Sequence, residues 1–182
     1  MAKIHFVRHG QAAAGFGAHR DPGLNELGRS QAEAVAAYLV ILGPIPIYSS
    51  PLARAYQTAQ PLADLWQVDI SIESRVAEIP SPTQDLDERA EWLRQAMQGS
   101  WSALGAEFQT WKADLGHCLL GLTTDCVIFS HYVAINAAVG LAQQDSRMVI
   151  FSPDNCSVTT LDNADDQLSV LDLGRIADTK IN

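Results

Sequence analysis

Short apolar runs alternate with longer amphipathic stretches along most of the chain. Runs such as Lys3 to Val7 and Cys126 to Ser130 are rich in β-branched and aromatic residues, which is typical of strands. Between the runs, apolar residues recur at helical spacing. The pattern predicts strands over 3–7, 45–48, 68–72, 126–130, 156–161 and 168–173, and helices over 26–42, 51–66, 86–98, 102–121 and 131–142.

Start and stop signals support two of these helices. Asn25 is a candidate N-cap for the first helix, and Gly43–Pro44 would end it. Ser50 is a candidate N-cap for the second helix, with Pro51 at its first position.

Strands that alternate with helices indicate βαβ units and a mostly parallel sheet with helices on both faces. We therefore expect an α/β fold, a three-layer α/β/α sandwich in one domain over residues 1–182. The helical stretch at about 80–121 interrupts the alternation, and we expect it to form a cap or insertion over one end of the sheet.

Composition narrows the class of protein. The chain has 182 residues, 47% hydrophobic and 18% charged, which suits one globular domain. Its net charge of −9 disfavours nucleic acid and anionic membrane surfaces as partners, although a local group of arginines can still bind a small anion. The oligomeric state stays open.

Targeting and metal-binding signals are weak. No run of 18 apolar residues and no signal-peptide pattern occurs, so we expect no membrane span and a cytoplasmic location. The three cysteines are far apart and form no CxxC pair, which predicts neither a disulfide framework nor a zinc site.

Three predicted strands end on polar residues, in the segments FVRHG (6–10), YSSPLAR (48–54) and FSHY (129–132). Ligands of open parallel sheets bind beyond the carboxyl ends of the strands. Arg8, His9, Arg54 and His131 would then meet at one edge, beside helix N-termini that favour anions. We therefore expect a phosphate pocket at this edge of the sheet. Because Gly10 has no side chain, the backbone could approach a bound ligand closely there.

The same segments resemble the histidine phosphatase superfamily, also called phosphoglycerate mutase-like. The matching residues are IHFVRHGQA (4–12), DPGLNELGRSQA (21–32), IYSSPLARAYQTA (47–59) and VIFSHYVAI (127–135). Four separated motifs in the family's order make the resemblance specific to branch 1 of that superfamily.

The resemblance implies a role for each matched residue. His9 would be the nucleophile and form a phosphohistidine, while Arg8, Arg54 and His131 would hold the phosphoryl oxygens. Glu78 matches the acidic proton donor by position, and Gln11 follows the Arg-His-Gly triplet on the substrate side. A histidine attacks only as neutral imidazole, and arginines can neutralise the transferring group, so we expect no metal and no cofactor.

The chain departs from the family pattern in three places. Tyr132 stands where many members have glycine, so that it could narrow the pocket or stack on a substrate. The loop 11–20 lacks the asparagine of the mutases and many phosphatases. The segment IPSPTQDLDE replaces the usual pattern after the acid, which leaves Glu73 and Asp85 as rivals to Glu78.

We therefore expect a metal-independent phosphomonoester hydrolase that acts on a small phosphorylated substrate through phospho-His9. Three alternatives remain: a phosphohistidine protein phosphatase, a phosphoglycerate mutase-type phosphotransferase, and a non-catalytic protein that binds a phosphate ligand. A mutase must hold two phosphate groups, and no second basic cluster is evident near residues 84–121.

Overall fold

The computed structural model describes residues 1–15 and 18–177. Its strands are β1 (Lys3–Arg8), β2 (Ile47–Ser49), β3 (Ile70–Ile72), β4 (Cys126–Ser130), β5 (Val158–Asp162) and β6 (Ser169–Asp172). Its α-helices are α1 (Glu26–Leu39), α2 (Ala53–Trp66), α3 (Leu86–Ala96), α4 (Ala106–Leu120) and α5 (Tyr132–Gln143).

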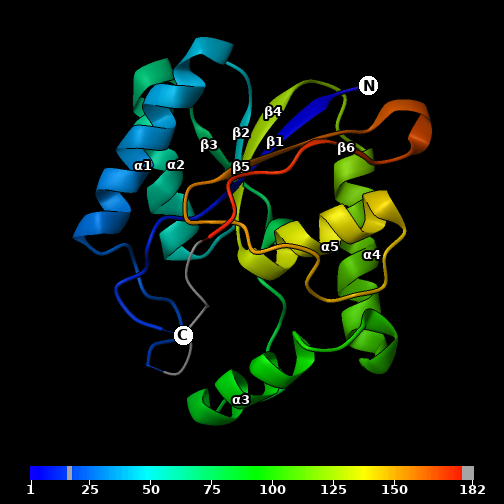
Figure 1. The fold of residues 1–182 in the computed structure, drawn as a ribbon. Coiled ribbons are helices and arrows are strands. Elements are labelled where there is room, and N and C mark those ends of the chain that lie inside the picture. Colours follow the sequence, from blue (N-terminus) through cyan, green and yellow to red (C-terminus); the bar gives the residue numbers. More distant parts are fainter. Residues whose placement is uncertain (16–17, 178–182) are drawn as a thin grey trace.

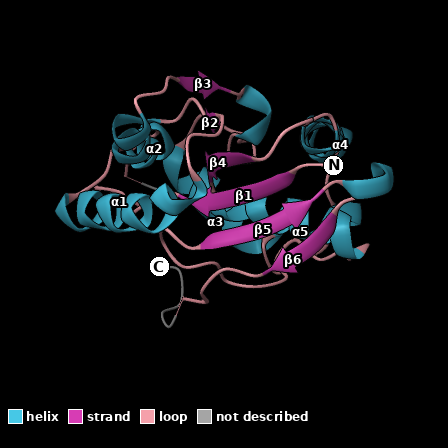
Figure 2. Cartoon of the chain, turned by 90° about the horizontal axis from the view of Figure 1, so that it is seen from above, coloured by secondary structure: helices cyan, strands magenta, loops and turns pink. Residues whose placement is uncertain are grey.

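The six strands form one sheet in the order β3-β2-β4-β1-β5-β6 (Figure 2). The strands β3, β2, β4 and β1 are parallel, with Arg8 of β1 opposite Ser130 of β4. The strand β5 runs antiparallel to both β1 and β6. The expected mostly parallel sheet is confirmed, and the pairing brings the carboxyl ends of β1, β2 and β4 to one edge.

Helices cover both faces of this sheet. Successive side chains of a strand point to opposite sides, so each strand contributes residues to two cores. Phe6 and Ile128 pack into a core with α4 and α5. Val7 and Phe129 pack into a second core with α1 and α2. The expected three-layer sandwich is therefore confirmed (Figure 1).

The stretch between β3 and β4 carries α3, which lies away from the sheet at the bottom of Figure 1. Trp92 of α3 stacks on Phe108 of α4, with ring centroids 5.0 Å apart. Leu93, Trp101 and Phe108 also join the core shared by the sheet and α5. Aromatic packing thus ties α3 to α4 and connects this stretch to the sheet.

The two expected helix starts have different outcomes. Asn25 caps α1 as expected, since its side chain accepts from the Gly28 amide at 2.8 Å. The expected cap at Ser50 and Pro51 is wrong, because α2 begins at Ala53 after an extended Leu52. Asp21, from a distant loop, accepts the Ala53 N–H at 2.8 Å instead.

Other boundaries shift by a few residues. The first helix ends at Leu39 and continues as a 3-10 turn to Leu42, and α4 begins at Ala106 after a separate turn at Trp101–Ala103. None of the helices in the described ranges combines the length and the apolar character needed to cross a bilayer.

Candidate active site

The carboxyl ends of three strands deliver the candidate residues to one place. The His9 amide donates to the Ser130 carbonyl at 3.0 Å, and the Ser50 amide donates to the Phe129 carbonyl at 3.0 Å. These bonds extend the ladders of the sheet by one residue beyond β1 and β2. His9 and Ser50, the residues that follow β1 and β2, are therefore positioned by backbone bonds to β4.

His9 is buried, and both of its ring nitrogens have partners. Its Nδ1–H donates to the Gly10 carbonyl at 2.7 Å, and Arg54 Nε donates to Nε2 at 3.1 Å. Burial lowers the pKa of His9 well below 6.5, and the charges of Arg54 and Arg8 lower it further. The ring is therefore neutral, with its lone pair on Nε2, as nucleophilic attack requires.

Arg54 is 3% exposed at the second residue of α2. Asp21 lies beside it, with Oδ1 3.8 Å from Arg54 Nη1, and the same oxygen accepts the Ala53 amide. Thr58 accepts the Gly10 amide at 3.0 Å and donates to the Arg54 carbonyl at 2.7 Å. Thr58 thus links the first turn of α2 to Gly10, the residue after His9, by hydrogen bonds.

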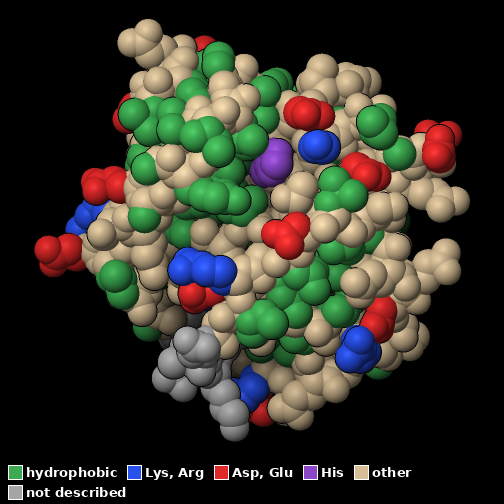
Figure 3. Space-filling model, turned by 45° about the horizontal axis from the view of Figure 1, so that its top comes forward, with side chains coloured by type: hydrophobic (Ala, Val, Ile, Leu, Met, Phe, Trp, Pro, Cys, Tyr) green, Lys and Arg blue, Asp and Glu red, His purple; other side chains and the backbone are tan. Residues whose placement is uncertain are grey.

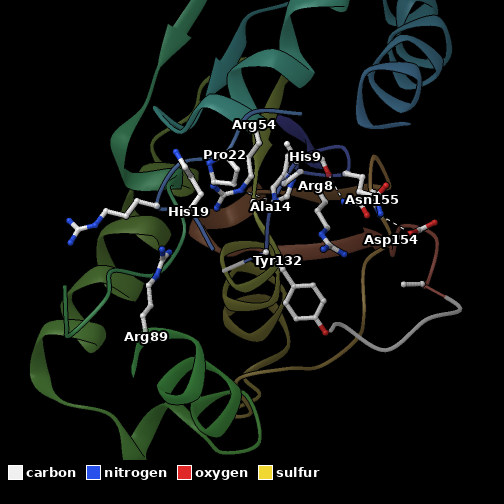
Figure 4. A pocket seen from close by; sticks show the side chains of 16 residues that line it. Arg8, His9, Ala14, His19, Pro22, Arg54, Arg89, Tyr132, Asp154 and Asn155 are labelled. Carbon is white, nitrogen blue, oxygen red and sulfur yellow. Dashed lines mark hydrogen bonds between the residues drawn. The ribbon is translucent and has the colours of Figure 1, made fainter. Parts of the chain in front are cut away.

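Arg8 projects from the end of β1 with its guanidinium carbon 5.1 Å from the centre of the Tyr132 ring (Figure 4). One terminal nitrogen donates to the Pro153 carbonyl at 2.7 Å. The buried Nε has no hydrogen-bond partner among the described residues. Tyr132 is 4% exposed and its hydroxyl lies 3.1 Å from Ser152 Oγ. Its ring is therefore fixed in position and packs against the Arg8 guanidinium.

His131 is fully buried as the N-cap residue of α5. Its ring centre lies 5.2 Å from that of His9, and its Nε2 is 2.8 Å from Ser50 Oγ. Burial lowers its pKa well below 6.5, with His9, Arg54 and Arg8 adding to the effect. The sheet therefore brings together the four residues expected at this edge, Arg8, His9, Arg54 and His131.

Glu78 lies in the loop before α3, and it is 6% exposed. Its carboxylate accepts from the Ile79 amide at 3.1 Å and from the Val133 amide, in the first turn of α5, at 3.2 Å. Burial raises its pKa, although the Arg54 charge and these backbone bonds oppose the shift. A raised pKa suits a proton donor.

The rival acids have other partners. Glu73 forms an ion pair with Arg75 at 2.6 Å, and hydrogen bonds from Arg75 lower the pKa of that carboxyl. Asp85 caps α3 by accepting from the amides of Asp87 and Glu88. Of the three candidates, Glu78 is the buried carboxyl whose pKa responds to Arg54 and Arg8.

Gly10 packs closely against α1. A Cβ at this position would lie 2.5 Å from the Gly28 carbonyl oxygen in α1. A Cβ at Gly28 would lie 2.1 Å from the Gln11 carbonyl oxygen. The two glycines therefore allow the chain after β1 to cross α1 at close range. Gln11 lines the pocket as expected, and its side-chain oxygen accepts from Asn25.

These residues open into a cavity of about 480 Å³ (Figure 4). Arg8, His9 and Arg54 form its inner end, and Asp154 and Asn155 lie on one side. Glu78 and His131 are not among the residues that line the cavity; His131 lies directly behind the lining, with its ring centre 5.2 Å from that of His9.

A second group of basic residues lies away from the His9 end of the cavity. Two arginines, Arg20 and Arg89, line it there, together with His19. Arg20 donates to the Gln84 carbonyl at 2.7 Å, which joins the loop after β1 to the segment before α3. The sequence predicted no second basic cluster near residues 84–121, and that stretch contributes one arginine, Arg89, to the lining. Arg89 lies among acidic residues in sequence, and only the position of α3 brings it to the pocket.

Within residues 1–15 and 18–177, no group of three or more His, Cys, Asp or Glu side chains is placed to hold a metal ion. The charged groups that can meet an anion at the inner end are the guanidinium groups of Arg8 and Arg54.

The sequence is similar to proteins of one known family. The profile of the histidine phosphatase superfamily (branch 1) matches residues 4–175. A probable phosphoglycerate mutase, GpmB, from Salmonella paratyphi A is 26% identical over 92% of this chain and 87% of its own length. A glucosyl-3-phosphoglycerate phosphatase from Mycolicibacterium vanbaalenii is 38% identical over 43% of this chain and 36% of its own length.

Other curated relatives are much longer than the matched region. The match covers 12% of a PE-PGRS family protein and 22% of a bifunctional protein, both from Mycobacterium tuberculosis. These two matches extend over 34% and 42% of this chain, so they compare part of the chain with a small part of a longer protein.

Solved structures share the fold over nearly the whole chain. A mycobacterial glucosyl-3-phosphoglycerate phosphatase has a TM-score of 0.77 at 22% identity, over 97% of this chain and 100% of that one. A phosphoserine phosphatase from Entamoeba histolytica, in complex with 3-phosphoglyceric acid, has a TM-score of 0.73 at 23% identity, over 96% and 98% of the two chains. With the profile match over residues 4–175, these comparisons show that the chain belongs to branch 1 of the histidine phosphatase superfamily.

Proposed function

We propose that this protein is a metal-independent phosphomonoester hydrolase that works through a phosphohistidine on His9. The observation that carries the proposal is the state of His9: a buried, neutral ring whose Nε2 lone pair faces Arg54 at 3.1 Å. The bond from Nδ1 to the Gly10 carbonyl holds this tautomer.

In the first step, Nε2 attacks phosphorus, and the bond from phosphorus to the ester oxygen breaks. Arg54 exchanges its bond to Nε2 for one to a phosphoryl oxygen, and Arg8 offers its unpartnered Nε. Charge spreads over the phosphoryl oxygens in the transition state, so these fixed cations lower the barrier. Glu78 gives its proton to the departing alkoxide.

In the second step, water attacks the phosphohistidine and loses a proton to Glu78. The bond from phosphorus to Nε2 breaks, inorganic phosphate leaves, and the starting protonation states return. The raised pKa of Glu78 supports this cycle, because the carboxyl must carry a proton when the first step begins.

We further propose that the leaving group of the substrate carries a carboxylate. Arg20 and Arg89 supply positive charge at the outer end of the cavity. Structural neighbours bind 3-phosphoglyceric acid and phosphoserine, and both ligands have a carboxylate beside the phosphate. A cavity of about 480 Å³ has the size of a small-molecule site, which favours a small molecule over a phosphohistidine protein as substrate.

The first experiment is a phosphatase screen with chelator present, on p-nitrophenyl phosphate and a panel of metabolite phosphates. We expect turnover in the wild type and none in His9→Ala. An acid-labile ³²P label should appear on the wild type during turnover. Full activity in His9→Ala would refute the phosphohistidine route.

The carboxylate proposal has its own matched pair of variants on α3. Arg89→Ala should raise KM for phosphoserine or 3-phosphoglycerate by roughly 10- to 100-fold, since hydrogen bonds to charged groups contribute about 1.5–3 kcal/mol. It should leave KM for p-nitrophenyl phosphate almost unchanged. Arg94→Ala is the control, because Arg94 is exposed and pairs with Glu91. Equal effects of the two variants would refute the proposal.

A further inference from the structure

His131 is the one fully buried histidine of the site, and only one of its ring nitrogens has a partner. Its Nε2 lies 2.8 Å from Ser50 Oγ, while Nδ1 has no hydrogen-bond partner among the described residues. A neutral imidazole carries its proton on one nitrogen and a lone pair on the other. The role of His131 therefore depends on what Ser50 does with its hydroxyl proton.

The hydrogen-bond partners of Ser50 indicate whether its hydroxyl or His131 Nε2 donates the proton. Its oxygen already accepts the Leu52 amide at 3.2 Å, and its own amide is held by the Phe129 carbonyl. Ser50 is fully buried, and His131 Nε2 is the acceptor that lies within reach of its hydroxyl proton. A serine that donates to Nε2 satisfies both its lone pair and its proton.

The reverse arrangement leaves more groups unsatisfied. If His131 donated from Nε2, the Ser50 hydroxyl proton would be buried with no acceptor in the described structure. The Nδ1 lone pair would then also lie buried beside a site that receives a dianionic phosphoryl group, which it would repel. Both consequences are unfavourable, because buried polar groups without partners cost free energy.

We propose that Ser50 fixes the tautomer of His131 so that Nδ1 carries the proton and donates to an oxygen of the transferring phosphoryl group. The second clause rests on the function proposed above. Ser50 is then a positioning residue, which acts through His131. The Nδ1–H group has no partner among the described residues, so it is available to a bound phosphoryl oxygen. The ring centres of His131 and His9 are 5.2 Å apart.

This assignment also says what His131 does not do. Burial lowers the pKa of His131, and the nearby His9, Arg54 and Arg8 lower it further, so the ring is neutral and adds no charge. With Nε2 occupied by Ser50, it neither takes nor gives a proton during the reaction. Its contribution is a neutral hydrogen bond of fixed direction.

The test is long-range ¹H–¹⁵N NMR on protein labelled at histidine, which distinguishes the two neutral tautomers directly. Comparison with a His131→Gln spectrum identifies the His131 signals among the five histidines of the chain. We expect the wild type to show the Nδ1–H form, and inorganic phosphate to shift that proton signal downfield. The Nε2–H form in the wild type, or no response to bound phosphate, would overturn the proposal.

Two buried neighbouring serines provide matched variants. Ser50→Ala removes the donor to His131, whereas Ser49→Ala removes a hydroxyl that donates to the Ser50 carbonyl at 2.8 Å. We expect Ser50→Ala to change the His131 tautomer and to lower kcat/KM about 10- to 100-fold, with recovery in Ser50→Thr. Ser49→Ala should keep the wild-type tautomer. The same tautomer in Ser50→Ala as in the wild type would overturn the assignment.

The NMR readouts also separate this inference from the proposed function. A wild-type protein that shows the Nδ1–H form and a phosphate-dependent shift, but hydrolyses no phosphomonoester, supports the inference and contradicts the function. A protein that hydrolyses phosphomonoesters with His131 in the Nε2–H form supports the function and contradicts the inference.

Discussion

Opposite pKa shifts prepare the two titrating partners of the proposed reaction. Burial and two arginines keep His9 unprotonated far below its ordinary pKa of 6.5. Burial raises the pKa of Glu78, so that it keeps its proton above its ordinary value of 4.5. One environment thus maintains a free base and a free acid at the same pH.

A pH profile tests this pairing. We expect kcat/KM to persist below pH 6.5, because His9 needs no deprotonation there, and to fall as rising pH removes the proton of Glu78. Glu78→Gln should lower kcat for an alkyl phosphate by about 10²- to 10⁴-fold, the usual range for general acid catalysis. Its effect on p-nitrophenyl phosphate should be much smaller, because that leaving group needs no proton.

Each variant is compared with the wild type on the same substrate and at the same pH, so that ionisation of the phosphate ester cancels. An unchanged alkaline limb in Glu78→Gln would assign the proton donor elsewhere. Equal losses on both leaving groups would likewise contradict the assignment.

At the scale of elements, the segment after β6 returns to the active site. Arg175 and Ala177 pair with the loop Ser152–Asp154 through two backbone bonds of 2.8 Å, and Ala177 lines the cavity. The carbonyl of Pro153 in this loop holds Arg8, and the adjacent Asn155 donates to the His9 carbonyl at 2.9 Å. This C-terminal segment therefore supports both residues through one loop.

Truncation tests that support. A chain ending at Gly174 should raise KM for phosphomonoesters by about 10-fold, because small displacements of binding groups are costly in catalysis. A chain ending at Ala177 is the control, since it keeps both bonds to the loop. Steady-state kinetics and the binding of inorganic phosphate would be measured on both proteins. Equal KM values for the two truncations would show that the segment is dispensable.

At the scale of the whole molecule, the stretch 80–121 shares its core with the sheet. Leu93 and Phe108 pack in the same cluster as Phe6 and Ile128. On the face shown in Figure 3, acidic and basic side chains are interspersed rather than gathered by sign. We propose that the chain is one domain and that the helical stretch is a cap built into its core.

Unfolding in urea tests the single domain. Three of the four tryptophans, Trp92, Trp101 and Trp111, lie in this stretch, and Trp66→Phe removes the fourth. Fluorescence of that variant reports on the stretch alone, while far-ultraviolet circular dichroism reports on the whole chain. We expect the two transitions to coincide, as a cooperative unit requires. A fluorescence transition at lower urea would identify a separate unit.

The class of fold and the residues at the inner end of the site could be predicted from the sequence alone. Periodicity and helix signals are local, and they predict the alternating elements, the Asn25 cap and the strand ends that carry Arg8, His9 and His131. Once a parallel sheet is inferred, the rule for the carboxyl ends of strands brings these residues together. The motif roles assigned to them, and to Glu78, stay predictions.

The walls of the pocket and the contacts that support it depend on long-range packing. Arg8 and the Pro153 carbonyl are 145 positions apart in sequence, and Asn155 and His9 are 146 apart. The Asp21 bond that starts α2, the close contact of Gly10 with Gly28, and the arrival of Arg89 from α3 also join separate segments. Such contacts depend on how the layers pack and leave no periodic signal in the chain, so no local pattern could have predicted them.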